Sequence, residues 1–204
     1  MRDVAAVVLA AGSSRRFGSD KLAHCIRLDG MELPLAAHAL RPWLQAFARV
    51  TVVVRPDGEA LQRLVGDALG QYVSRLQWLP CKNAAQGMAA SLVAGVSENS
   101  EASGWLIGLA DMPCVPLSAI AGVRDAIADG AALAAPFYAG RRGHPVGFSS
   151  RYYSDLLALQ GDAGARQLLE REATQIHHIT IENAGIFADI DQLSDLQTLE
   201  VHIY

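Results

Sequence analysis

The 204-residue sequence lacks any run of about 18 uninterrupted apolar residues, the length that a membrane-spanning helix needs. It also lacks a basic surplus, because its net charge is −4 and its pI is about 5.8, whereas nucleic-acid binders carry clustered Lys and Arg. The first residues show no small-residue cleavage site of the kind that ends a signal peptide. These absences predict a soluble, cytoplasmic protein that binds neither membranes nor nucleic acid.

Cysteine is scarce. The three residues Cys25, Cys81 and Cys114 are odd in number, and their spacing fits neither a CxxC pair nor a zinc site. They are therefore expected to be reduced thiols without a catalytic role. The chain also has no internal repeat or low-complexity stretch, and its length suits a single domain over residues 1–204.

Short apolar runs alternate with helix-length segments along the chain. The apolar runs at 4–10, 50–54, 75–79, 104–110, 131–137 and 175–181 predict strands. The segments at 34–48, 57–69, 86–96, 116–129, 152–160, 163–172 and 193–200 predict helices. This alternation indicates an α/β fold, a three-layer αβα sandwich with a mixed, mostly parallel sheet. Such sheets bind ligands at the carboxyl ends of their strands.

The first strand opens into a polar loop that contains glycines and cations. Residues 9–21 read LAAGSSRRFGSDK, with Gly12 and Gly18 as flexible points and Arg15, Arg16 and Lys21 as charges. Glycine-rich loops let backbone N–H groups gather around a phosphate, and Arg and Lys add charge. The spacing matches neither the Walker A nor the GxGxxG motif. The loop is therefore interpreted as a phosphate site of another class, in preference to an ordinary solvated loop.

Two acidic motifs have the residues that a magnesium site needs. Asp111 follows the apolar run 104–110, and Mg²⁺ takes only one or two protein carboxylates besides substrate phosphates. Asp189 and Asp191 fall on one face of an extended segment. Taken alone, Asp111 fits a turn or a helix cap better than a metal site, whereas the Asp189–Asp191 pair fits a metal site and a cap for the last helix equally well.

Three further motifs leave their roles open. His144, in RGHPVGF at 142–148, suits a ligand, a base or a structural hydrogen-bonder. Asp162, in GDAGAR at 161–166, suits a substrate contact or a cap for the helix that follows. The small residues of GMAASL at 87–92 permit close approach of either a flat ligand or another helix.

Taken together and in this order, these motifs resemble those of the molybdopterin nucleotidyltransferases, within the broader NTP-transferase fold. The resemblance is greatest to the molybdenum cofactor cytidylyltransferase branch. The matching segments span nearly the whole chain: LAAGSSRRFGSDK at 9–21, GMAASL at 87–92, LADMP at 109–113, RGHPVGF at 142–148, GDAGAR at 161–166 and DID at 189–191.

The resemblance implies an enzyme that uses Mg²⁺ to transfer CMP, or less favourably GMP, from an NTP to the phosphate of a pterin, releasing pyrophosphate. It implies catalytic roles for Arg15, Lys21 and Asp111, and Mg²⁺ ligation by Asp111 and Asp191. The implied nucleotide contacts are Leu9, Ala10, Ala11, Gly12, Ser13, Arg15, Lys21 and Ser91. The implied acceptor contacts are Arg142, His144 and Asp162. A molybdoenzyme would be the client protein.

The sequence departs from the family pattern in two places. Residues 22–27 read LAHCIR where the family has an apolar run and a proline, and residues 192–196 read QLSDL where it has TPEDL. The first departure keeps open a transferase for a sugar phosphate or polyol phosphate. A non-catalytic chaperone that binds a nucleotide or cofactor for a molybdoenzyme is the alternative from another class.

Overall fold

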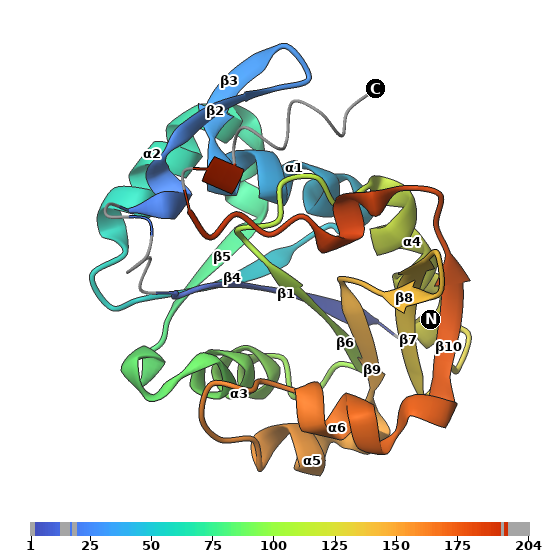
Figure 1. The fold of residues 1–204 in the computed structure, drawn as a ribbon. Coiled ribbons are helices and arrows are strands. Elements are labelled where there is room, and N and C mark those ends of the chain that lie inside the picture. Colours follow the sequence, from blue (N-terminus) through green and yellow to red (C-terminus); the bar gives the residue numbers. More distant parts are fainter. Residues whose placement is uncertain (1–2, 13–16, 18–19, 193, 196–204) are drawn as a thin grey trace.

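A computed structural model describes residues 3–12, 17, 20–192 and 194–195. Its main sheet has eight strands in the order β10-β7-β9-β6-β1-β4-β5, with β8 paired to β7 (Figure 1). The strands are β1 (Val4–Ala10), β4 (Val50–Val54), β5 (Leu76–Pro80), β6 (Gly104–Leu109), β7 (Leu133–Tyr138), β8 (Arg141–Arg142), β9 (Val146–Ser149) and β10 (Ile176–Thr180).

The sheet is mixed and mostly parallel. Strands β1, β4, β5 and β6 run parallel to one another, and β10 runs parallel to β7. Strand β9 is antiparallel to both β6 and β7 and joins the two parallel groups. Apolar, largely β-branched sequences such as VTVVV in β4 suit strands that are covered on both faces.

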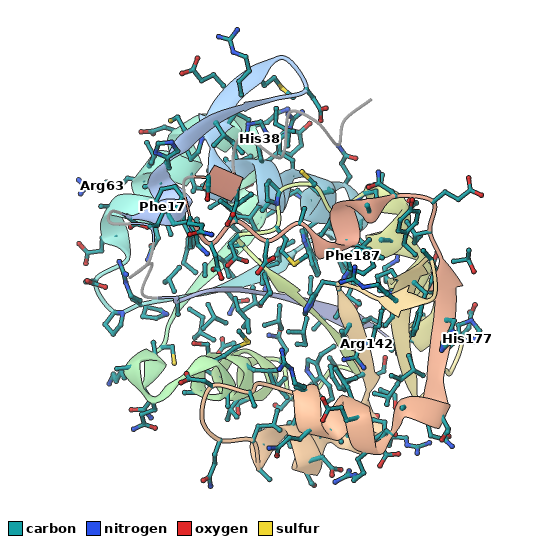
Figure 2. All side chains as sticks on the ribbon, in the orientation of Figure 1. Phe17, His38, Arg63, Arg142, His177 and Phe187 are labelled. Atoms are coloured by element: carbon teal, nitrogen blue, oxygen red, sulfur yellow. The ribbon has the colours of Figure 1, made fainter. Side chains whose placement is uncertain are left out.

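Helices cover both faces of the sheet, which confirms the predicted three layers (Figure 1). On one face lie α1 (Leu35–Ala46), α2 (Glu59–Leu69) and α4 (Leu117–Ala128), and on the other lie α3 (Met88–Glu98), α5 (Tyr153–Leu157) and α6 (Arg166–Arg171). Side chains fill the space on each side of the sheet (Figure 2), forming two hydrophobic cores. Short 3₁₀ turns complete the fold: η1 (Lys21–Ala23), η2 (Gly70–Arg75), η3 (Ala84–Gln86), η4 (Ser150–Tyr152), η5 (Ala173–Gln175) and η6 (Ala184–Phe187).

The structure contains a β-hairpin that the apolar pattern did not predict. Strands β2 (Cys25–Leu28) and β3 (Met31–Pro34) pair antiparallel around Asp29 and Gly30, whose φ angles are 51° and 74°. Two successive residues with positive φ form a hairpin turn in which Asp-Gly is a preferred sequence. This dipeptide was therefore the sequence signal for the hairpin. Each strand is only four residues long and half exposed, which leaves little apolar periodicity to detect.

Other boundaries differ from the prediction at helix ends. Helix α2 begins after Gly58, and α6 begins after Ala165, so Asp162 does not cap the helix that follows it. The segment 188–191, expected to be extended, pairs with no strand, and the N–H of Asp189 donates to the Phe187 carbonyl at 3.0 Å. The expected C-terminal helix at 193–200 lies almost wholly outside the described residues. Among the helices that the structure describes, none is long and apolar enough to cross a membrane.

Close packing of α1 on β6 gives a test of the core. A Cβ added at Gly108 would overlap the Trp43 indole, which is 3% exposed and has no room to move. We expect Gly108→Ala to lower the free energy of unfolding by about 1–3 kcal/mol, the usual cost of overpacking. Urea unfolding followed by circular dichroism measures the change.

Gly66→Ala is the matched control, because it makes the same chemical change inside α2. The nearest atom there belongs to Val73, which is partly exposed and can shift. Alanine favours helix over glycine, so this variant should unfold at an equal or higher urea concentration. If Gly108→Ala were as stable as Gly66→Ala, the described packing of Trp43 would be wrong.

Candidate functional site

The predicted phosphate loop follows directly after β1. At the carboxyl end of the strand the buried residues are Leu9, Ala10 and Ala11. Gly12 is exposed, and a Cβ added to it would have no other atom within 4 Å. Ser13 and Arg15, two of the predicted nucleotide contacts, lie outside the described residues. Phe17 is buried and packs edge-on against the His24 ring, with 5.4 Å between ring centroids.

Arg55 links the two ends of this loop, a role that the sequence reasoning missed. It follows β4, the neighbour of β1 in the sheet. Its Nη1 donates to the Gly12 carbonyl at 3.5 Å, and its Nη2 lies 3.7 Å from Asp20 Oδ2. The only sequence signal was a cation directly after a buried strand, at the sheet edge where ligands bind.

Lys21 joins three segments that are far apart in the chain. Its Nζ donates to Asp111 Oδ2 at 2.8 Å and to Asp191 Oδ1 at 3.2 Å. Lys21 is 7% exposed, so its charge depends on these carboxylates. Burial lowers the pKa of Lys21, but the two carboxylates raise it by more, and the net pKa lies above its usual 10.5. The structure thus brings together three of the predicted site residues, with Lys21 positively charged.

The C-terminal segment is held against the tip of β6 by its backbone. The N–H of Ile190 donates to the Asp111 carbonyl at 3.0 Å, and Asp195 Oδ2 accepts from the N–H groups of Asp191 and Gln192 at 2.8 and 2.9 Å. Within the described part of the chain, the salt bridges of Lys21 are to Asp111 and Asp191 and not to Asp189. Its pKa is raised, by partial desolvation and by repulsion from Asp191 and Asp111. Negative charge is therefore concentrated around a single described ammonium group.

His144 lies close enough to Asp111 for the carboxylate to act on its imidazole. Burial lowers the pKa of His144 to about 4, against an opposing effect of Asp111 and with a further lowering by Arg142. The imidazole is therefore neutral at pH 7. Its backbone N–H donates to the Ile186 carbonyl at 3.0 Å, which joins β9 to the C-terminal segment. Arg142, labelled in Figure 2, is half-buried on β8.

Ser91 lies on α3, and Asp162 lies against the start of that helix. A Cβ added at Gly87 would lie only 2.5 Å from Asp162 Oδ1, and the Gly161 carbonyl accepts from the Ala89 N–H at 3.0 Å. Gly87 also has a φ of 114°, a backbone conformation that favours glycine. Both this angle and the close approach of Asp162 therefore require glycine at this position. Ser91 is 4% exposed, packed within α3. The GDAG and GMAAS motifs therefore meet each other, at the start of a helix whose N-terminus favours negative charge.

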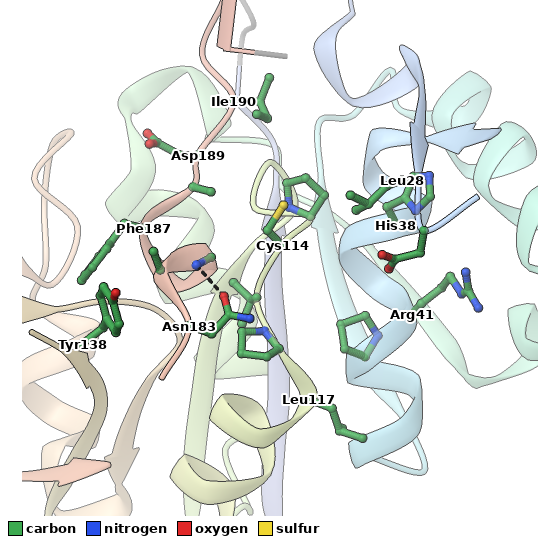
Figure 3. A pocket seen from close by; sticks show the side chains of 18 of the residues that line it. Leu28, His38, Arg41, Cys114, Leu117, Tyr138, Asn183, Phe187, Asp189 and Ile190 are labelled. Atoms are coloured by element: carbon green, nitrogen blue, oxygen red, sulfur yellow. Dashed lines mark hydrogen bonds between the residues drawn. The ribbon is translucent and has the colours of Figure 1, made fainter. Parts of the chain in front are cut away.

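A pocket of about 820 Å³ lies beside the segment that carries Asp189 and Ile190 (Figure 3). Its walls come from the β2–β3 turn, α1, the loop after β6, the end of β7 and the C-terminal segment, including Asp189 and Ile190. Figure 3 shows Asp189, Phe187 and Tyr138 on one side of the C-terminal segment, with His38 and Arg41 across the pocket. The Arg141 guanidinium lies 4.5 Å above the Phe187 ring.

The pocket wall contains a cysteine, Cys114, that is a poor candidate for a nucleophile. Burial, with a smaller effect of Asp29, raises the pKa of the Cys114 thiol in the pocket wall to about 11. A protonated thiol is a poor nucleophile. No group of three or more His, Cys, Asp or Glu side chains gathers as a metal cluster within the described part of the chain. Two carboxylates beside a cation remain, an arrangement suited to binding phosphate and a hard cation together.

Comparison with known proteins gives consistent matches. The family model described as MobA-like NTP transferase domain matches residues 6–178. The purine catabolism protein PucB of Bacillus subtilis (strain 168) is 30% identical over 168 residues, which cover 80% of this chain and 79% of that protein. Rv0371c of Mycobacterium tuberculosis H37Rv superposes with a TM-score of 0.80 at 22% identity, covering 97% of each chain. A structure of Rv0371c in complex with manganese superposes with a TM-score of 0.74 at 20% identity and the same coverage.

The contacts of Arg55 predict a specific kinetic effect. Arg55→Ala should raise the KM for the NTP by less than about fivefold with kcat little changed, because a partly exposed ion pair contributes at most about 1 kcal/mol. Arg27→Ala removes a more exposed ion pair, with Glu32 at 3.2 Å, from the hairpin and should leave KM unchanged. Steady-state kinetics over NTP concentration measure both; equal effects of the two variants would contradict the link between Arg55 and the loop.

Proposed function

The chain belongs to the MobA-like NTP transferase family and is a nucleotidyltransferase, and we propose that it transfers CMP from CTP to the terminal phosphate of a molybdopterin-type acceptor. An oxygen of the acceptor phosphate attacks the α-phosphorus of the NTP. The bond from the α-phosphorus to the bridging oxygen of the β-phosphate breaks, and pyrophosphate leaves. The observation that carries the proposal is the contact of Lys21 with both Asp111 and Asp191.

The protein groups contribute positioning and charge. Nucleotidyl transfer needs no dedicated protein nucleophile, because the acceptor supplies the attacking oxygen. Lys21 and Arg15 would bind the triphosphate, and the exposed backbone at Gly12 leaves room for a phosphate to approach. The protonated Lys21 ammonium then stabilises negative charge that develops on the transferred group.

Asp111 and Asp191 are the residues that we propose to hold Mg²⁺. They fit the ion because both carboxylates already face one positive charge, and Asp111 Oδ1 is buried without a hydrogen-bond partner among the described residues. Mg²⁺ commonly takes one or two protein carboxylates and completes its shell with water and substrate phosphates. When bound, the ion would neutralise charge on the triphosphate and polarise its phosphoryl oxygens. The manganese complex of Rv0371c supports a divalent metal in a protein of this fold.

We propose that the acceptor head group lies in the 820 Å³ pocket. This volume falls in the range of small-molecule sites, and the pocket wall continues into Asp191 through Asp189 and Ile190. Tyr138 lies 6.3 Å from Phe187, between ring centroids, and Arg141 covers the Phe187 ring. Aromatic rings with a guanidinium plane suit a flat heterocycle such as a pterin better than a sugar or polyol.

A screen of NTPs against phosphorylated acceptors tests the function. CTP and GTP are each incubated with Mg²⁺ and molybdopterin, a sugar phosphate or a polyol phosphate, and pyrophosphate release is measured. We expect release with CTP and the pterin. Release with only a sugar or polyol phosphate would overturn the acceptor and leave nucleotidyl transfer standing. Tight NTP binding without turnover on any acceptor would favour a chaperone for a molybdoenzyme.

The metal assignment predicts unequal effects of three similar substitutions. Asp111→Asn should lose most activity while staying folded, because the amide matches the carboxylate in size but carries no charge to hold Mg²⁺. Asp191→Asn should act likewise. Asp189→Asn is the matched control and should lose less, since Asp189 makes no described ion pair with Lys21. Initial rates at limiting Mg²⁺, with thermal unfolding for each variant, measure this; full activity of Asp111→Asn would refute the role.

Selection of the base predicts an effect at Ala11. The LAAG sequence at 9–12 resembles the cytidylyl branch, whereas the guanylyl branch reads LAGG. The Ala11 methyl stands where a larger purine would need closer approach to the backbone, so CTP should be preferred over GTP by a modest ~1–3 kcal/mol. Ala11→Gly should shift the ratio of kcat/KM values toward GTP. A native preference for GTP would make the base assignment wrong, and an unchanged ratio in Ala11→Gly would remove this explanation of it.

A further inference from the structure

The wall of the 820 Å³ pocket that faces the C-terminal segment carries a cation without an anionic partner. Arg41 projects from α1 and lies across the pocket from Asp189 (Figure 3). It is half-buried, and among the described residues its side chain makes one hydrogen bond, from Nη1 to the sulfur of Met31 at 2.7 Å. A thioether is a weak and uncharged acceptor. The other guanidinium donors are therefore available to a ligand with a carbonyl oxygen or an anionic group.

A carboxylate lines the same part of the wall and does not pair with this cation. Asp29 lies in the turn of the β2–β3 hairpin, two residues before Met31, and it also lines the pocket. The contact of Arg41 with Met31 therefore places the guanidinium at the end of the hairpin that carries Asp29. Within the described part of the chain, neither Asp29 nor Arg41 forms a salt bridge. Both groups can therefore hydrogen-bond to one ligand.

The neighbouring imidazole of His38 responds to both charges. His38 is 4% exposed on α1, and its Nε2 donates to the Ile26 carbonyl at 3.1 Å. Burial lowers the pKa of His38, the Ile26 contact opposes this, Arg41 lowers the pKa further and Asp29 raises it. The imidazole is therefore neutral at pH 7 and lies within electrostatic range of both groups. This wall of the pocket thus presents one guanidinium, one carboxylate and a neutral ring.

A guanidinium and a carboxylate together match one edge of a pterin ring. Along that edge a pterin has a carbonyl oxygen at C4, an N–H at N3 and an amino group at C2. A guanidinium donates to the carbonyl oxygen, and a carboxylate accepts from the two neighbouring N–H groups. The other two carboxylates of the wall, Asp189 and Asp195, belong to the C-terminal segment that carries Asp191. They lie on the side where the acceptor phosphate would bind.

We propose that Asp29 and Arg41 select the acceptor by binding this edge of its ring. Asp29 accepts from N3–H and from the 2-amino group, and Arg41 donates to the C4 carbonyl. The inference rests on the proposed function, because it takes the pocket as the site of the acceptor head group. It assigns two residues that the sequence resemblance did not name. It also places acceptor selection at the hairpin, whose first strand lies in the segment where the sequence departs from the family.

Fluorescence titrations with pterin and with lumazine test the assignment. Lumazine has the same rings and the same C4 carbonyl, but oxygen replaces the 2-amino group, so it presents an acceptor where Asp29 needs a donor. We expect the native protein to bind pterin about 10- to 100-fold more tightly than lumazine, the usual effect of losing a hydrogen bond to a charged group. Asp29→Asn should reverse this preference, because an amide accepts from N3–H and donates to the oxygen of lumazine. Arg41→Ala should weaken binding of both heterocycles by a similar factor.

The hairpin offers both a conservative variant and a matched control. Asp29→Asn preserves the turn, because Asn-Gly is a preferred sequence where two successive residues have positive φ. Glu32→Gln makes the same change of charge on the same hairpin, at an exposed position outside the pocket wall. This control should leave the affinities for both heterocycles unchanged.

Equal binding of pterin and lumazine by the native protein, or binding of neither, would overturn the inference. An unchanged preference in Asp29→Asn, or an equal change in Glu32→Gln, would do so as well. Pyrophosphate release from CTP and molybdopterin by the native protein decides the proposed function separately. If that release occurs and Asp29→Asn keeps the native kcat/KM for molybdopterin, the proposed function stands and the assignment of Asp29 and Arg41 is wrong.

Discussion

The contact of the Lys21 ammonium with the carboxylates of Asp111 and Asp191 is the interaction on which the site depends. Lys21 is nearly buried, and a buried charge without a partner is strongly destabilising. The partners lie 90 and 170 residues away in the chain. The contact can form only when the loop after β1, the tip of β6 and the C-terminal segment come together at one edge of the sheet. Folding of the sheet and assembly of the site are therefore coupled.

The same contact explains how the site can remain ready for its substrates. Two carboxylates facing each other would repel without a cation, and Lys21 supplies one in the described structure. On the proposed function, Asp111 and Asp191 would hold Mg²⁺, and the triphosphate would give Lys21 a new anionic partner. The metal would give the two carboxylates a cation in place of Lys21, and the NTP would give Lys21 an anion in place of the carboxylates. Binding of either one would therefore favour binding of the other.

The sequence predicted the parts of the fold that depend on local patterns. Continuous apolar runs predicted β1, β4 and β6. The charged residues that follow β1 and β6 indicated which edge of the sheet carries the site. The hairpin at Asp29-Gly30 was missed because its strands are short and half exposed. Three contacts were not predictable from spacing, because each depends on how distant segments pack. They are Asp162 with Gly87, Arg55 with Gly12, and Lys21 with Asp191. The family resemblance named Asp191, and the geometry then joined it to Lys21.

A crystal structure with Mn²⁺ and a non-reacting CTP analogue tests whether Asp111 and Asp191 hold the metal, because the anomalous signal of Mn²⁺ locates the ion. We expect Mn²⁺ between the carboxylates of Asp111 and Asp191, with the Lys21 ammonium moved from them onto the triphosphate. Lys21 still bonded to both carboxylates, with the metal bound elsewhere, would contradict it.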